Sequence, residues 1–322
     1  MNLSLVTHFD INYAARAIAM ISSAERNSSQ EICWKVLALD LETFDLLKKL
    51  DAPNIQIFNV EQIGPELKMV QISRTHKEFC WSAGAIFLDF VLKNNLTTPF
   101  VGYIDADCYF FGDISSCISE LGNDKNIAAH AHNFSKKRQH WEKSVGKFNV
   151  GLVIGRKSTE LAKCIQTWKD EVLESCTSDT STGNFGDQKY LDSWPIRYKG
   201  FVELRSRGVG LAPWNIDHLK LSNSRSGMTV NNDDLIFYHF HGVHQVIDSK
   251  FCTMLEPARG YTITRKVRQR LYLPYIRELL TVANQFGIQA FPESSFVPSK
   301  LVLRNLYFTF FFKLKKKLIA II

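Results

Sequence analysis

Short apolar segments alternate with amphipathic ones along about the first 250 residues of this 322-residue chain, and no other feature limits the fold as much. The expected strands cover 3–9, 34–40, 55–60 and 100–107, and the expected helices cover 13–25, 42–50 and 78–94. Strands separated by helices pair mostly in parallel, with helices on both faces of the sheet. We therefore expect an α/β fold with a Rossmann-like, mixed but mostly parallel sheet flanked by helices.

The same pattern continues beyond residue 125. Further strands are expected at 127–133, 148–155 and 235–242. Ser158 is a residue type that caps helices. After it, apolar residues recur at helical spacing, at Leu161, Cys164, Ile165, Trp168 and Val172. The sequence therefore predicts a helix that begins after Ser158 and buries this face.

Charge divides the chain into two parts. Residues 255–322 carry 12 Lys and Arg against 3 Asp and Glu, whereas residues 1–254 carry 27 against 29. The net charge of +7 therefore belongs to the C-terminal end. We expect an α/β domain over residues 1–254 and a basic, largely helical region over residues 255–322.

Residues 299–322 combine six Lys or Arg with a block of aromatic and aliphatic residues and no acid. The block is too short and too often interrupted by charge to span a bilayer. Cations beside apolar residues are typical of segments that lie on an anionic membrane surface, which is the interaction we expect. The alternative is a C-terminal helix that packs on the domain with its lysines in water.

The cysteines and the N-terminus indicate the compartment. There are seven cysteines with no C-x-x-C pair, which is typical of reduced thiols in the cytoplasm. Residues 1–20 lack a basic leader, and Arg16 interrupts their apolar run, which argues against a signal peptide. Together with the basic end, this predicts a cytoplasmic protein that is peripheral on the inner face of the membrane.

The segment 101–113, VGYIDADCYFFGD, contains two carboxylates between apolar residues. On an extended backbone Asp105 and Asp107 point to the same side, about 6 to 7 Å apart, so both can face one divalent cation. The alternative is a strand end that exposes its carboxylates to solvent. The neighbouring Tyr103, Phe110 and Phe111 indicate a buried approach, where unpaired carboxylates are costly.

The segment FYHFHG offers a second set of ligands. His239 and His241 share one face of the expected strand, and either can instead be a hydrogen-bonded core or surface residue. Two aspartates and a histidine suit Mn²⁺ or Mg²⁺, with open positions for phosphate oxygens.

Four motifs in this order resemble nucleotide-sugar glycosyltransferases of the GT-A fold, nearest to the retaining type that includes glycogenin and bacterial lipopolysaccharide galactosyl- and glucosyltransferases. The resemblance covers about residues 1–250. Its motifs are DINYAARAIAMIS, YIDADCYFFGD, FNVGLVIGRKS with FGDQKYLD, and YHFHGV. It implies a GT-A fold for this part of the chain, to which the basic, helical C-terminal region would be an appendage.

The resemblance also implies roles for single residues. The metal ligands would be Asp105, Asp107 and His239. The donor, a nucleoside-diphosphate sugar and by expectation a UDP-sugar, would contact Asp10, Asn12, Tyr13, Asn149, Gly151 and Gly242. Asp187 and Gln188 would be the catalytic pair beside the donor sugar. Arg74 is a further donor-binding candidate, with a surface salt bridge as the alternative.

Other interpretations stay open. Tyr13 could pack on the sheet, Asn149 and Gly151 could mark a strand bend, and Asp187 could cap a helix. The family usually has a lysine that touches the diphosphate where this chain has Gln245. Either His244 or Lys250 supplies that charge, or the site differs locally.

The expected activity is metal-dependent transfer of a sugar, with retention of configuration, to a glycan or lipid-linked acceptor in bacterial-type surface polysaccharide or lipopolysaccharide synthesis. A nucleotidyltransferase could use the same two aspartates, but the segment THFDINYAARA contains no glycine-rich phosphate loop. A non-catalytic membrane- or nucleic-acid-binding protein would explain the basic end but not four ordered motifs. We expect no nucleic-acid partner.

Overall fold

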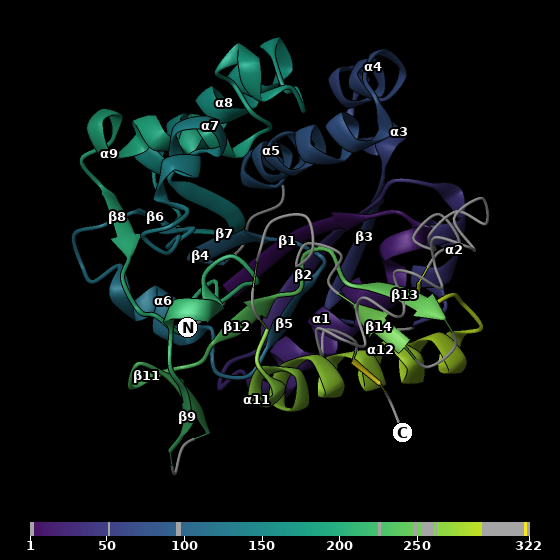
Figure 1. The fold of residues 1–322 in the computed structure, drawn as a ribbon. Coiled ribbons are helices and arrows are strands. Elements are labelled where there is room, and N and C mark those ends of the chain that lie inside the picture. Colours follow the sequence, from purple (N-terminus) through teal and green to yellow (C-terminus); the bar gives the residue numbers. More distant parts are fainter. Residues whose placement is uncertain are drawn as a thin grey trace.

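The computed structural model describes residues 3–50, 52–94, 98–224, 227–247, 250–252, 261, 263–291 and 319–320. Its centre is a seven-stranded sheet in the order β3-β2-β1-β4-β7-β6-β8 (Figure 1). These strands are β1 (Leu3–Phe9), β2 (Ile32–Ala38), β3 (Ile55–Asn59), β4 (Phe100–Ile104), β6 (Ile127–Ala131), β7 (Phe148–Arg156) and β8 (Phe201–Leu204). Only β7 runs antiparallel to its two neighbours, which confirms the mixed, mostly parallel sheet.

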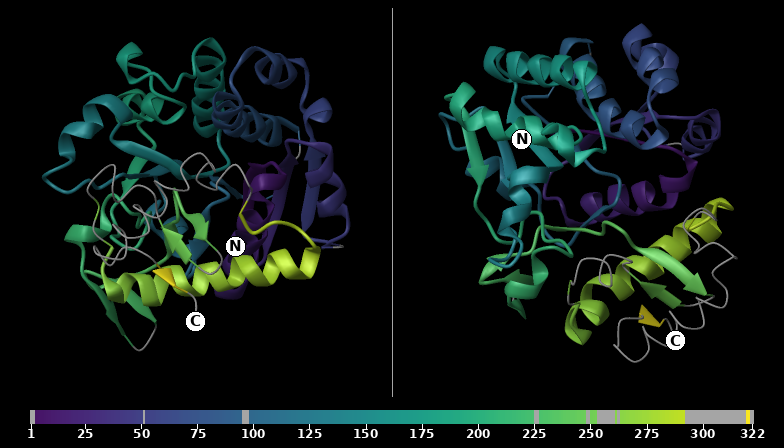
Figure 2. Two further views of the ribbon diagram at one scale, coloured as in Figure 1. Left: turned by 45° about the vertical axis from the view of Figure 1, so that its right-hand side comes forward. Right: turned by 45° about the horizontal axis from the view of Figure 1, so that its top comes forward.

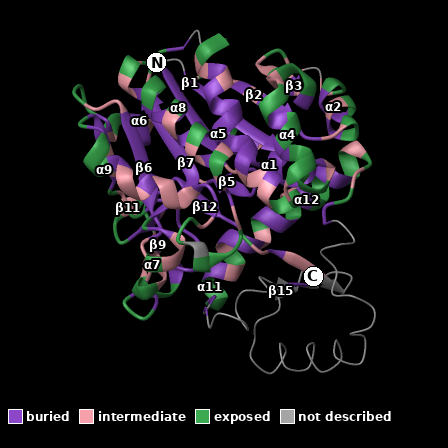
Figure 3. Ribbon diagram, turned by 90° about the horizontal axis from the view of Figure 1, so that it is seen from above, coloured by how far each residue is buried: buried purple, intermediate pink, exposed green. Residues whose placement is uncertain are grey.

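Helices cover both faces of the sheet. One hydrophobic core joins Leu5 of β1 to α1 (Ala14–Asn27) and α12 (Leu273–Phe286), and the other joins Val6 to α5 (His76–Asn94) and α8 (Thr159–Glu174). Leu5 and Val6 are neighbours on one strand, so their side chains point to opposite faces. Figure 1 shows α5 and α8 on one side of the sheet and α1 and α12 on the other. Figure 3 shows the strands between them as buried.

The remaining helical elements are short. The α-helices are α2 (Leu41–Lys48), α3 (Val60–Ile63), α4 (Pro65–Ser73), α6 (Ser115–Glu120), α7 (Glu142–Val145), α9 (Trp194–Arg197) and α11 (Arg265–Val267). The 3₁₀ turns are η1 (Ile11–Tyr13), η2 (Gln139–Trp141), η3 (Thr180–Thr182), η4 (Gln188–Ser193) and η5 (Ile216–His218), and η6 (Arg268–Tyr272) is a π-helical segment.

Helix α8 forms as its sequence predicts. The Ser158 side chain accepts a hydrogen bond from the backbone N–H of Leu161 at 3.1 Å, which satisfies a donor that the helix itself leaves unpaired. The predicted apolar face is buried, at Leu161, Cys164, Ile165, Trp168 and Val172.

Small sheets surround the carboxyl end of β4. Strand β5 (Cys108–Phe110) pairs antiparallel with β12 (Phe237–His239). A meander contains β9 (Leu221–Asn223), β10 (Met228–Val230) and β11 (Asp233–Asp234), and a third sheet contains β13 (His244–Ile247), β14 (Lys250–Cys252) and β15 (Ile319–Ala320). The β5–β12 pair brings residues near position 239 to the end of β4.

Residues 265–286 of the C-terminal region are helical, as expected, whereas Ile319–Ala320 forms a short strand. Helix α12 packs against α1. The Tyr272 and Tyr238 hydroxyls lie 2.8 Å apart, and the rings of Tyr275 and Phe240 stack with centroids 3.9 Å apart. Figure 2 shows these helices beside the β13–β14 ribbon. The division at residue 254 stays a prediction.

The predicted membrane-binding segment, 299–322, lies outside the described residues except for Ile319–Ala320, which pairs with β14. Within the part of the chain that the structure describes, no helix is long and apolar enough to cross a membrane.

Candidate metal centre

Asp105 and Asp107 lie in the turn that joins β4 to β5. The backbone N–H of Cys108 donates to the carbonyl of Asp105 at 3.1 Å, which closes this turn. The expected extended backbone is therefore wrong at these two residues, and a strand's alternation does not determine where the carboxylates point. The turn instead directs both of them towards β12.

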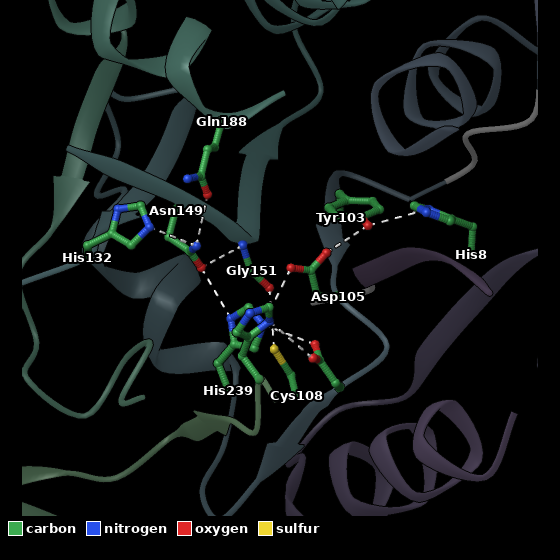
Figure 4. A network of polar contacts seen from close by, with 11 residues as sticks. His8, Tyr103, Asp105, Cys108, His132, Asn149, Gly151, Gln188 and His239 are labelled. Carbon is green, nitrogen blue, oxygen red and sulfur yellow. Dashed lines mark hydrogen bonds and ion pairs between the residues drawn. The ribbon is translucent and has the colours of Figure 1, made fainter. Parts of the chain in front are cut away.

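His239 completes the cluster from β12, where it lies opposite Cys108. Its Nε2 is 3.0 Å from an Asp107 carboxylate oxygen and 3.7 Å from one of Asp105 (Figure 4). His241 is farther out: its Nδ1 is 3.9 Å from Asp107, and its side chain is 55% exposed against 6% for His239. Ligand atoms of Asp107, His239 and His241 lie within 4.8 Å of one another.

The donor set fits a divalent cation. Ligands bound to one such ion at about 2.1 Å lie about 3 Å apart when they are neighbours in its coordination shell. The 3.0 Å between His239 and Asp107 matches this value, whereas the 3.7 Å between His239 and Asp105 is longer. Two carboxylates with one imidazole also match the ligands expected for Mn²⁺ or Mg²⁺.

The three groups shift one another's pKa values. Burial would raise the pKa of Asp107, but the charge and hydrogen bond of His239 hold it below its usual value. Burial raises the pKa of Asp105, and His239 only partly offsets this. Burial would lower the pKa of His239, but Asp107 raises it above its ordinary value. These shifts favour a protonated imidazole beside an ionised Asp107 carboxylate, and a cation at this place would compete with that proton.

Strand β7 contacts the cluster of Asp105, Asp107 and His239 at a point where its pairing with β6 is irregular. Ala129 lies opposite Val153, whereas the next residue, His130, lies opposite Asn149. The extra residues on β7 form a bulge. The Gly151 carbonyl in this bulge accepts from the Asp105 N–H at 3.3 Å. The sequence interpretation of a strand bend is thus confirmed, and the bend faces the candidate ligands.

Asn149 connects the cluster to the neighbouring loop. Its Oδ1 lies 3.3 Å from Nδ1 of His239, and its Nδ2 lies 3.2 Å from Gln188 Oε1 and from Nε2 of His132. Gln188 in turn donates to the Val145 carbonyl at 2.8 Å. Asn149 therefore joins the predicted donor-sugar residues to the predicted metal ligands (Figure 4).

Asp187 precedes η4 and is buried. Burial, with the nearby charge of Asp105 as a second cause, raises the pKa of Asp187 to about 8. Asp187 occupies the N-cap position of η4, as the alternative interpretation expected, but its side chain makes no capping hydrogen bond there. This carboxyl therefore carries a proton at neutral pH.

Asp10, Asn12 and Tyr13 form a second group at η1. Asp10 Oδ1 accepts a hydrogen bond from the Tyr13 backbone N–H at 3.1 Å. Asp10 Oδ2 accepts from Asn12 Nδ2 at 3.3 Å and lies 2.8 Å from His76 Nε2. Tyr13 is 42% exposed, so it does not pack inside the core. The group is open to a ligand.

Two predicted donor-binding residues lie differently. Gly242 has a φ of +78°, a left-handed conformation that glycine adopts readily, in the turn after β12. Arg74 donates to Ser82 Oγ and to the Leu173 carbonyl, both at 2.6 Å. It contacts none of the other candidates, and among the described residues it forms no salt bridge.

Sequence reasoning missed several residues that support the site. Tyr103 donates to Asp105 at 2.8 Å and lies 3.4 Å from Nδ1 of His8. His132 approaches Asn149 from the end of β6. The signal for Tyr103 was its position two residues before Asp105, although the contact itself depends on the turn. His132 carried no comparable signal.

No family model matches the chain. It is 27% identical to the uncharacterized protein YfnD of Bacillus subtilis over 274 residues, which cover 83% of this chain and 86% of that protein. It is 28% identical to the uncharacterized protein YfnF of the same organism over 235 residues, which cover 70% and 77%.

Two solved structures share the fold. The galactosyltransferase LgtC, in complex with donor and acceptor sugar analogs, aligns with a TM-score of 0.53 and 14% identity over 92% of this chain and 98% of its own. The glycosyltransferase GlyE of Streptococcus pneumoniae TIGR4 aligns with a TM-score of 0.51 and 15% identity over 89% and 63%. The chain therefore has the GT-A fold that its motifs predicted.

Proposed function

We propose that this protein is a glycosyltransferase that moves a sugar from a nucleoside-diphosphate sugar, by expectation a UDP-sugar, to a glycan or lipid-linked acceptor. The observation that carries the proposal is the meeting of Asp105, Asp107 and His239 at the end of β4 in a GT-A sheet. The names of LgtC and GlyE give the class of reaction that this fold performs elsewhere.

In this reaction the bond between the anomeric carbon and the diphosphate breaks, and the bonding electrons stay on the diphosphate. Mn²⁺ or Mg²⁺ held by Asp105, Asp107 and His239 would supply Lewis-acid stabilisation of that charge. The Asn149 side chain accepts from Nδ1 of His239, which leaves Nε2 free to bind an ion. Tyr103 fixes one oxygen of Asp105 by its hydrogen bond.

The sugar would lie beside Asn149, Gly151, Asp187 and Gln188. A protonated Asp187 can donate a hydrogen bond to a sugar hydroxyl as well as accept one. Gln188 would face the positively charged anomeric centre, and configuration would be retained. The η1 group of Asp10, Asn12 and Tyr13 would bind the nucleobase, with the Gly242 turn beside the donor. Arg74 has no role in this arrangement.

The acceptor belongs, in this proposal, to surface polysaccharide or lipopolysaccharide synthesis. Residues 299–322 would hold the protein on the anionic inner face of the membrane, where lipid-linked acceptors are found. No nucleic acid takes part.

The test is a panel of sugar nucleotides with Mn²⁺, scored by thermal stabilisation and slow hydrolysis. Nucleoside triphosphates are included because their exclusive turnover would identify a nucleotidyltransferase instead. Asp105→Ala and Asp107→Ala should fold but lose about 100-fold or more of the transfer rate, the scale for removal of a main electrostatic stabiliser. Asp45→Ala on the exposed face of α2 is the control. Full activity in either Asp105→Ala or Asp107→Ala would contradict the metal site.

A further inference from the structure

Arg16 is a buried cation in the first turn of α1, with 5% of its surface exposed. Its two terminal nitrogens donate to backbone carbonyls, one to Asn12 at 3.2 Å and the other to Val243 at 3.1 Å. Its guanidinium carbon lies 4.6 Å from the centroid of the Tyr13 ring. Arg16 therefore touches both the η1 group and the loop that follows His239 and His241.

The groups that hydrogen-bond to the Arg16 guanidinium or stack on it are uncharged. Among the described residues, no carboxylate forms an ion pair with it. Carbonyl oxygens carry no formal charge, and the first turn of α1 contains no acidic residue. The N-terminus of a helix adds a partial positive charge of about +0.5. A buried cation in such surroundings is costly for the protein alone and is well placed to bind an anion.

One hydrogen bond joins Arg16 to the loop that follows the candidate metal ligands His239 and His241. Val243, which accepts from Arg16, follows directly after the turn at Gly242. Tyr13, which lies against the guanidinium, is 42% exposed, whereas Phe291, whose ring centroid is 5.2 Å from the guanidinium carbon, is buried.

We propose that Arg16 binds the diphosphate of the donor nucleotide and supplies the positive charge that Gln245 does not. This inference rests on the proposed function. A guanidinium already oriented by two carbonyls can direct its remaining N–H groups at phosphate oxygens in its own plane. When the bond to the sugar breaks, the bonding electrons pass to a β-phosphate oxygen. Arg16 stabilises the growing charge without giving up a proton.

The experiment measures the dissociation constants of UDP and of uridine, both with saturating Mn²⁺, by calorimetry on the full chain. Arg16→Gln should weaken UDP about 10- to 100-fold, the scale for a hydrogen bond to a charged group, and leave uridine unchanged. Arg16→Lys keeps the charge but not the planar fork, so its loss for UDP should be smaller. Arg26→Gln is the matched control, since Arg26 lies on the same helix and pairs with Glu278 at 2.9 Å.

The possible outcomes distinguish diphosphate binding by Arg16 from a structural role and from a role at the metal centre. Equal loss of UDP and uridine affinity, or none, in Arg16→Gln would overturn the inference and leave Arg16 as a clamp between α1 and the Val243 loop. Weaker binding of Mn²⁺ alone would assign Arg16 to the metal centre instead. If Arg16→Gln does not fold, the ratio of the two dissociation constants in Arg16→Lys gives the same decision. A wild-type protein that binds neither UDP nor ADP nor GDP would remove the proposed function itself.

Discussion

A single proton on Asp187 links the candidate site to the stability of the fold. The folded carboxyl has a pKa of about 8 because it is buried and because Asp105 is near. In an unfolded chain the same carboxyl has a pKa of about 4. Folding therefore favours the protonated form, and the corresponding stability is fully present below pH 4 and lost as pH rises through 8.

Asp187→Asn should remove this pH dependence, since an amide does not titrate. The melting temperature of the variant minus that of the wild type should increase by several degrees from pH 5 to pH 8.5. In a chain of roughly this size, a change of about 2 to 4 °C corresponds to 1 kcal/mol of stability. The measurement is thermal unfolding in EDTA. A constant difference across this range would mean that Asp187 is already ionised at neutral pH.

The two histidines of β12 and its turn should differ in their effect on metal binding. His239 is buried between both carboxylates, whereas His241 is more than half exposed. We expect His239→Ala to weaken Mn²⁺ binding by about 100-fold or more, because the loss of a residue that only supports a ligand already costs about 10- to 100-fold. The more exposed His241 should matter less, so His241→Ala should weaken Mn²⁺ binding by less than about tenfold. Titration with Mn²⁺ by calorimetry checks the order. The reverse order would make His241 the principal imidazole ligand.

At the scale of the elements, β7 packs its backbone directly against two candidate site residues at Gly151. A Cβ added at Gly151 would lie 2.6 Å from Asn149 Oδ1 and 2.9 Å from His239 Nδ1. Gly151→Ala should therefore push both side chains apart, cost about 1 to 3 kcal/mol of stability and weaken Mn²⁺ binding.

Gly155→Ala on the same strand is the matched control for Gly151→Ala. Its Cβ would lie 2.5 Å from the Asn126 carbonyl and 2.7 Å from Leu161, and it would touch no candidate site residue. It should lose a similar amount of stability in urea unfolding but keep the affinity for Mn²⁺. Equal Mn²⁺ affinity in the two variants would show that the bulge does not position His239.

Six strands of the central sheet and helices α1, α2, α5 and α8 could be predicted because each is encoded locally, by an apolar run or by a cap such as Ser158, whereas β8 was not predicted. The β4–β5 turn could not, since Asp105, Ala106 and Asp107 lie between apolar segments and contain no glycine or proline to mark a turn. The bulge at Gly151 and the Asn149–His239 contact depend on pairing between distant strands. The candidate metal ligands could be identified by residue type, but their relative positions depend on the tertiary structure.

At the scale of the whole molecule, the basic end should determine where the protein works. Each basic residue near an anionic membrane surface contributes about 1 kcal/mol, and residues 299–322 contain six. The full chain should co-sediment with anionic vesicles at low salt and less at high salt or with neutral vesicles. A truncation before Ser299 should lose this binding. Equal binding by both chains would place the membrane contact elsewhere or remove it.

The β5–β12 pair also has a consequence for synthesis on the ribosome. Asp107 is made about 130 residues before His239, its partner at 3.0 Å. Synthesis proceeds at roughly 5 to 20 residues per second, so the residues between Asp107 and His239 take on the order of 10 s to make. During this time neither carboxylate has the imidazole of His239 beside it. Two close negative charges do not bury stably by themselves. We therefore expect the nascent β4–β5 turn to stay hydrated until β12 emerges. The candidate metal centre should then be among the last parts of the domain to fold.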